Sequence, residues 1–120
     1  MLEQEGGLEN YISDVLDGKD STFNYLSLQY RDRYITMVKR LDVSNPNVLS
    51  NSLELVAEEL FNTKNDHVPY ISSFLLFSIE VDKYCMDNHN WYSKKTLIQI
   101  LVQILNRNCF VSNNRRCDIL

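Results

Sequence analysis

The sequence has few of the residues that turn a chain or cross-link it. Its 120 residues include three Gly, two Pro and three Cys. So little Gly and Pro leaves few tight turns, which favours long helices over many short strands. An odd number of cysteines without a CxxC spacing excludes a disulfide framework and fits a reducing compartment such as the cytosol.

A basic surface and a long hydrophobic run are missing as well. The formal net charge of −4 argues against a nucleic-acid-binding surface, which is usually basic. The longest uncharged apolar run, residues 68–79, would extend about 18 Å as a helix, which is too short to span a bilayer. The acidic, polar N-terminus lacks the pattern of a signal peptide. We therefore expect a cytoplasmic protein with no nucleic-acid partner and no membrane anchor.

Helical periodicity is the main pattern that is present. Apolar residues at spacings of three and four predict a first helix over residues 8–16, ended by Asp17-Gly18 with Gly as its C-terminal cap. Residues 20–41 predict a second helix, long enough for a bend, whose start can be capped by Asp20, Ser21 or Thr22. Asn45-Pro46 predicts the start of a third helix, because Asn caps helices and Pro suits the first helical position.

The two later segments are the most apolar. Residues 67–86 predict a helix that is apolar on nearly every face, and such a helix belongs inside a protein, wrapped by others. Residues 93–106 are also apolar, but β-branched residues alternate there as in a strand, at Ile98, Ile100, Val102 and Ile104. We predict a helix capped by Ser93, because the run is long and no partner strand is evident. Residues 109–120 predict a short helical turn and a tail.

These segments predict one all-α domain over residues 1–120. A central, nearly uncharged helix is covered by amphipathic helices, and neither an internal repeat nor a low-complexity segment interrupts the pattern. Residues 1–7 precede the first apolar stripe and residues 118–120 follow the last one, so both ends are expected to fray.

Catalytic and cofactor-binding patterns are absent from the sequence. Neither His67 nor His89 lies in a known catalytic motif, and no phosphate-binding glycine loop or metal-binding HExxH occurs. Cys85 and His89 are four residues apart and could share a helix face as metal ligands. We favour a buried cysteine beside an exposed loop histidine, since zinc sites normally show paired short spacings. We therefore expect no enzyme, no catalytic residue, no cofactor and no metal site.

Binding of another helix is the function that amphipathic helices can supply. A groove between two such helices accepts a third through apolar contacts at i, i+3, i+4 and i+7. The stripes in residues 34–41 and 49–60 could frame a groove, with the start of the central helix as its floor. In the alternative interpretation, these stripes only pack on the core.

The order of segments resembles the Bcl-2 family of apoptosis regulators, in particular the inhibitors encoded by large DNA viruses. The resemblance covers about residues 8–118. Its matching segments are YITMVKRLDV at residues 34–43, ELF at residues 59–61, and Ile71 with Phe77-Ser78 in the central helix. It implies a Bcl-2-like helical bundle with a central apolar helix wrapped by amphipathic helices.

The function implied by the resemblance is anti-apoptotic. A Bcl-2-like viral protein would sequester the amphipathic death helix of pro-apoptotic relatives, such as Bim, Bak and Bax, in a hydrophobic groove in the host cytoplasm. Its partners could recruit it to the mitochondrial surface. The resemblance places the groove at Tyr34, Met37, Val38, Leu41, Val56, Leu60, His67, Tyr70, Ser73 and Phe74. An open groove is an apolar patch that tends to be covered, so a homodimer through the groove face is also expected.

The sequence departs from the family at the ligand-binding motif. Where the family has Asn-Trp-Gly-Arg-Ile, this chain has residues 67–71, HVPYI, and only the Ile is retained. Tyr70 therefore replaces the Arg whose ion pair holds an aspartate of the bound helix. We expect a narrow partner range. The alternative function is a Bcl-2-fold viral modulator of host innate immune signalling that acts through another face, with Tyr34, Tyr70 and Phe74 packed inward to fill the groove.

Overall fold

The computed structural model describes residues 3–62 and 70–107, and these residues form five α-helices without a β-strand among them. The all-α prediction is confirmed, as is the choice of helix over strand for residues 93–106. Within the described ranges, no helix is long and apolar enough to cross a membrane. The helices are α1 (Glu3–Leu16), α2 (Ser21–Lys39), α3 (Pro46–Asn62), α4 (Tyr70–Asn88) and α5 (Lys94–Leu105).

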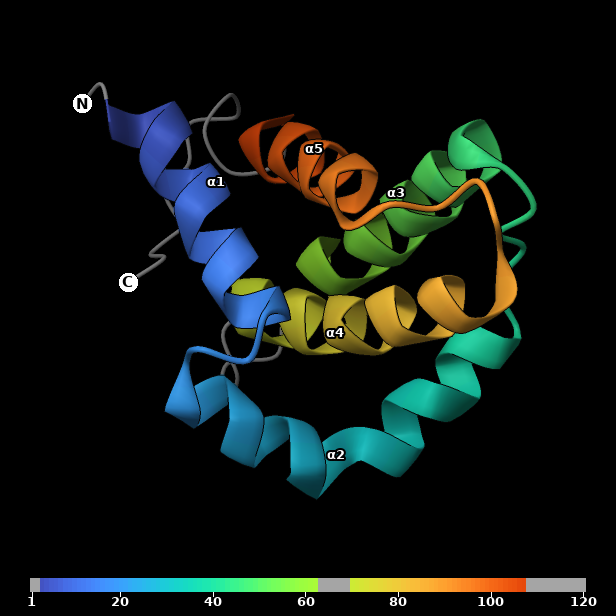
Figure 1. Ribbon diagram of the computed structural model, residues 1–120, viewed down its shortest axis with the longest axis horizontal. Coiled ribbons are helices and arrows are strands. Elements are labelled where there is room, and N and C mark those ends of the chain that lie inside the picture. Colours follow the sequence, from blue (N-terminus) through green and yellow to red (C-terminus); the bar gives the residue numbers. More distant parts are fainter. Residues whose placement is uncertain (1–2, 63–69, 108–120) are drawn as a thin grey trace.

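Helix α4 is the element that the other four helices contact. It packs against α1, α2, α3 and α5, and Figure 1 shows α2 along one side of it with α3 and α5 along the other. The side chains of Leu75, Phe77, Val81 and Cys85 are fully buried. Burying one such Leu or Phe side chain contributes about 1.5–3 kcal/mol, so the core is organised around this helix.

Helix α1 begins before its apolar stripe. The sequence predicts a start at residue 8, whereas the helix begins at Glu3. Burial of Leu8, Ile12, Val15 and Leu16 fixes the later turns, and each residue added in front of them gains a backbone hydrogen bond without a new nucleation cost. The predicted stop is confirmed, because Gly18 has a φ of +79°, a left-handed conformation that suits glycine.

Helix α2 has the cap and the bend that its length suggests. Asp20, one of three candidate caps, accepts hydrogen bonds at Oδ1 from the backbone N–H groups of Thr22 at 3.0 Å and Phe23 at 3.2 Å. Tyr30 leaves the helical conformation, with φ −110° and ψ 16°. The resulting bend beside α4 is visible in Figure 1.

The starts of α3 and α5 follow the predicted capping residues. Asn45 Oδ1 accepts the backbone N–H of Val48 at 3.0 Å, and Ser93 Oγ accepts that of Thr96 at 3.2 Å. Both contacts satisfy backbone donors that a helix start leaves unpaired. The predicted first turn at Pro69 and the predicted tail at residues 109–120 lie outside the described residues.

Two glycines give a test of the α1 boundary with opposite signs. Gly18→Ala forces a Cβ into the left-handed region and should lower the free energy of unfolding by about 1–2 kcal/mol. Steric contact is not the cause, because the nearest atom to such a Cβ is Asn24 Oδ1 at 3.7 Å. Gly7 lies at an exposed position inside the helix. Gly7→Ala should therefore raise the free energy of unfolding by about 0.5–1 kcal/mol. Urea denaturation measures both, and equal effects would contradict the assigned boundary.

Candidate functional site

The α2 part of the predicted groove lies against α4. Tyr34, Met37 and Leu41 are half-buried and pack on the core. Val38 is buried, with 2% of its surface exposed. The Tyr34 ring centroid lies 6.2 Å from that of the buried Phe77, with the planes tilted by 59°, so the Tyr34 ring packs on the core.

The floor of the predicted groove is also closed. Phe74 has 0% of its surface exposed, and Ser73 in α4 is half-buried. Val56 is also half-buried, but it belongs to α3, which lies on the other side of α4 from α2 (Figure 1), so the two predicted walls do not face each other. The side chains of Leu60, His67 and Tyr70 lie outside the described part of the structure. The inward packing of Phe74 and Tyr34 is the arrangement expected of the alternative function, in which the groove is filled.

The described residues line a pocket of about 170 Å³ between α2 and the second half of α4. We call it the α2–α4 pocket. Of the predicted groove residues, Val38 is in its lining and Phe74 is not, because Phe74 lies in the first half of α4. The lining consists of Arg31, Ile35, Val38, Lys39, Glu80, Lys83, Tyr84, Asp87 and Asn88.

Glu80 is a buried carboxylate in the wall of this pocket. It is only 4% exposed, yet its contacts are long. Ser27 Oγ donates to Glu80 Oε2 at 3.5 Å, and Lys83 Nζ lies 3.7 Å from the same oxygen. A buried charge normally needs close hydrogen bonds to offset its lost hydration, so these two contacts leave Glu80 incompletely satisfied.

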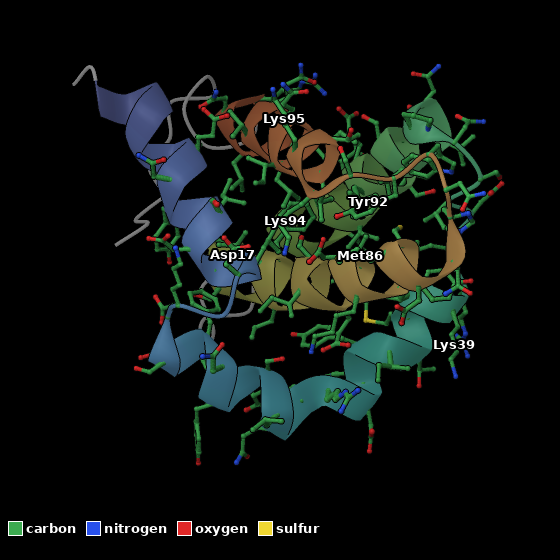
Figure 2. The ribbon with its side chains drawn as sticks, in the orientation of Figure 1. Asp17, Lys39, Met86, Tyr92, Lys94 and Lys95 are labelled. Atoms are coloured by element: carbon green, nitrogen blue, oxygen red, sulfur yellow. The ribbon has the colours of Figure 1, made fainter. Side chains whose placement is uncertain are left out.

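Asp82, two residues further along α4, is buried and well paired. It is 3% exposed. The Tyr92 hydroxyl donates to its Oδ1 at 2.5 Å, and Lys94 Nζ donates to its Oδ2 at 3.0 Å. Lys94 also lies 3.1 Å from Oδ1 of Asp17 at the end of α1. Figure 2 shows Asp17, Lys94 and Tyr92 in the region where α1, α4 and α5 meet, so one cation joins three helices.

This network shifts the titration of its members. Burial and the hydrogen bond to Asp82 raise the pKa of Tyr92 above its usual value. For Lys94, burial lowers the pKa, but hydrogen bonds to Asp82 and Asp17 outweigh it and the net pKa is raised. Both shifts favour the protonated side chain in the folded protein.

The turn between α4 and α5 is packed by aromatic rings. The His89 ring lies 6.0 Å from Tyr84 and 5.8 Å from Trp91, measured between centroids. The prediction of an exposed loop histidine is therefore wrong, since His89 is held half-buried between two rings. Cys85 is buried as predicted, and burial and the nearby Asp82 raise its pKa to about 11. Within residues 3–62 and 70–107, no three His, Cys, Asp or Glu side chains form a metal-binding group.

The two buried carboxylates are the site residues that the sequence pattern does not reveal. Glu80 and Asp82 directly follow the uncharged run, in a position where charged residues normally mark the end of a buried segment. The one signal in the sequence that could have revealed their burial is the uncharged run itself. A helix that is apolar on every face is enclosed by other helices, and this enclosure extends to the next turn, which contains Glu80 and Asp82. The partners Ser27, Lys94 and Tyr92 come from other helices or from the turn before α5, so sequence spacing cannot place them.

Comparison with known proteins gives no relative for this chain: no family model, no curated protein and no solved structure matches it. The resemblance to the Bcl-2 family thus remains a prediction from the sequence.

Two neighbouring lysines test the role of the Asp82 network. Lys94→Met removes the ammonium between Asp82 and Asp17 and should lower the free energy of unfolding by about 2–3 kcal/mol, near the lower end of the range for breaking a buried ion pair. Lys95 is exposed, so Lys95→Met should change it by no more than about 0.5 kcal/mol. Both values come from urea denaturation monitored by circular dichroism. Similar losses of stability in the two variants would rule out a specific role for the Lys94 ammonium between Asp82 and Asp17.

Alkaline pH should destabilise the fold. The folded state raises the pKa of Cys85, Tyr92 and Lys94, so their contributions to stability are fully present below the unfolded pKa values. For Cys85 the contribution is lost as the pH rises from 9.0 to about 11. We expect the midpoint urea concentration to fall over this range, and to fall less steeply in Cys85→Ala. A slope unchanged by this substitution would show that the buried thiol is not linked to folding.

Proposed function

We propose that this chain is an anti-apoptotic Bcl-2-like protein that captures the death helix of pro-apoptotic Bcl-2 proteins. The supporting observation is the half-buried apolar row of Tyr34 and Met37 on α2 and Leu41 just after its end, which packs on the core beside the central helix α4. In this proposal a ligand helix contacts the row through its own apolar stripe. Val56 joins this contact only once the helices rearrange, because α2 and α3 lie on opposite sides of α4 (Figure 1).

Capture requires that the groove open. Val38 and Phe74 have almost no exposed surface, so a ligand reaches them only after α2 or α3 moves away from α4. Helix α2 is already interrupted at Tyr30, and a kink of this kind allows residues 31–39 to move without disturbing the first half of the helix. The proposed self-association and recruitment to mitochondria depend on the same opening.

Calorimetric titration with death-helix peptides of about 26 residues tests the proposal. Two adjacent α3 residues form a matched pair: Val56 is half-buried in the predicted groove, whereas Leu55 is 66% exposed. Val56→Lys should weaken binding of the tightest peptide at least tenfold, about 1.4 kcal/mol, because it puts a charge in an apolar contact. Leu55→Lys should leave binding within about twofold of wild type, and melting curves should show that both variants are folded.

The filled groove favours a second function. If no peptide binds more tightly than about 10 μM, about −7 kcal/mol, the death-helix proposal fails and a modulator of host innate immune signalling that uses another face becomes the preferred assignment. Tyr25 and Leu28 on α2 are 62% and 74% exposed, and they supply apolar contacts of the kind that such a face needs.

A further inference from the structure

We propose that the α2–α4 pocket binds one lysine or arginine side chain of a partner protein, with Glu80 as the carboxylate that pairs with its charge. This pocket lies at the second half of α4, away from Phe74 and the predicted death-helix floor. The proposal therefore does not depend on the anti-apoptotic assignment, and the two can fail separately.

The unsatisfied charge of Glu80 is the first argument. Glu80 is 4% exposed and belongs to the lining of the pocket. Ser27 Oγ at 3.5 Å is at the limit of a hydrogen bond. Lys83 at 3.7 Å is too far to donate one, and its side chain is 54% exposed, so water screens the pair. A cation entering the pocket would supply the close, charge-assisted hydrogen bonds that Glu80 lacks.

The size and walls of the pocket are the second argument. A cavity of about 150 Å³ holds a molecule the size of benzene, so a pocket of about 170 Å³ has room for a single long side chain. Ile35, Val38 and Tyr84 in the lining offer apolar surface to the methylene stem of Lys or Arg. Tyr84 also offers an aromatic ring, which attracts a cation.

The charges at the mouth of the pocket decide between a cation and an anion. Arg31, Lys39 and Lys83 are exposed, and so is Asp87; exposed charges are strongly screened by water and salt. Glu80 is the buried charge, and interactions are stronger where water is excluded. Its sign therefore determines the ligand, and Lys83, whose Nζ lies 3.7 Å from Glu80 Oε2, is the cation with which the ligand competes.

The test compares an arginine probe with its neutral isostere. N-acetyl-arginine methylamide and the corresponding citrulline compound are titrated into the full chain, and the methyl resonances of Ile35 and Val38 are followed by NMR. We expect the arginine probe to bind at least tenfold more tightly than the citrulline probe. Glu80→Gln should reduce this ratio to threefold or less, whereas Asp87→Asn at the exposed rim should retain most of it.

Two further variants keep the test decisive if Glu80→Gln does not fold. Ile35→Trp should fill the pocket and abolish the shifts of the Val38 methyls, while Lys83→Ala should strengthen arginine binding at least twofold by removing the cation that pairs with Glu80. Equal binding of the two probes to wild type, or arginine binding that survives Ile35→Trp, would overturn the proposal. Loss of binding in Lys83→Ala would also overturn it, because it would indicate an anion site.

Discussion

Burial of α4 is the constraint on which the other helices depend. A helix enclosed on most of its faces contributes the largest part of the core, but it also buries any charge it carries, and a buried charge is costly unless it is paired. Asp82 meets this requirement through Tyr92 and Lys94, and Lys94 extends the contact to Asp17. The position of α1 and the start of α5 are thus tied to the needs of one carboxylate on the central helix.

Glu80 and Asp82 are two residues apart on the same helix, but their surroundings differ. Residues at this spacing point to nearly opposite sides of a helix, so Asp82 meets α1 and α5 while Glu80 meets α2. The α5 side supplies a lysine and a tyrosine at hydrogen-bonding distance. The α2 side supplies only Ser27 at 3.5 Å and leaves a pocket beyond the bend at Tyr30. In the proposed cation site, a ligand supplies the close pairing that the α2 side does not.

The sequence predicts the helices and their caps, because these depend on local patterns; the exception is the start of α1, which lies at Glu3 rather than at residue 8. Asp20, Asn45 and Ser93 each accept backbone donors close to them in sequence, and Gly18 stops α1 within one turn of its last buried residue. The sites depend on contacts between helices instead. Nothing within a few residues of Glu80 shows that Ser27 will face it, and His89 was predicted to be exposed because its burial requires the rings of Tyr84 and Trp91. The apolar stripe of the groove is visible in the sequence, whereas the inward packing of Phe74 is predicted only as part of the alternative function.

Closure of the groove has an energetic consequence for the proposed capture of a death helix. Exposing Val38 and Phe74, which are 2% and 0% exposed, costs about 1.5–3 kcal/mol for each side chain, or about 3–6 kcal/mol in total. Since about 1.4 kcal/mol corresponds to a factor of ten, opening reduces the apparent affinity of every ligand by about 10²- to 10⁴-fold. A helix with nanomolar intrinsic affinity is then bound at about 0.1–10 μM, and weaker helices are excluded. In the proposed function, closure therefore favours a narrow partner range on its own, in addition to the tyrosine that the Bcl-2 resemblance aligns with the family's arginine at residue 70.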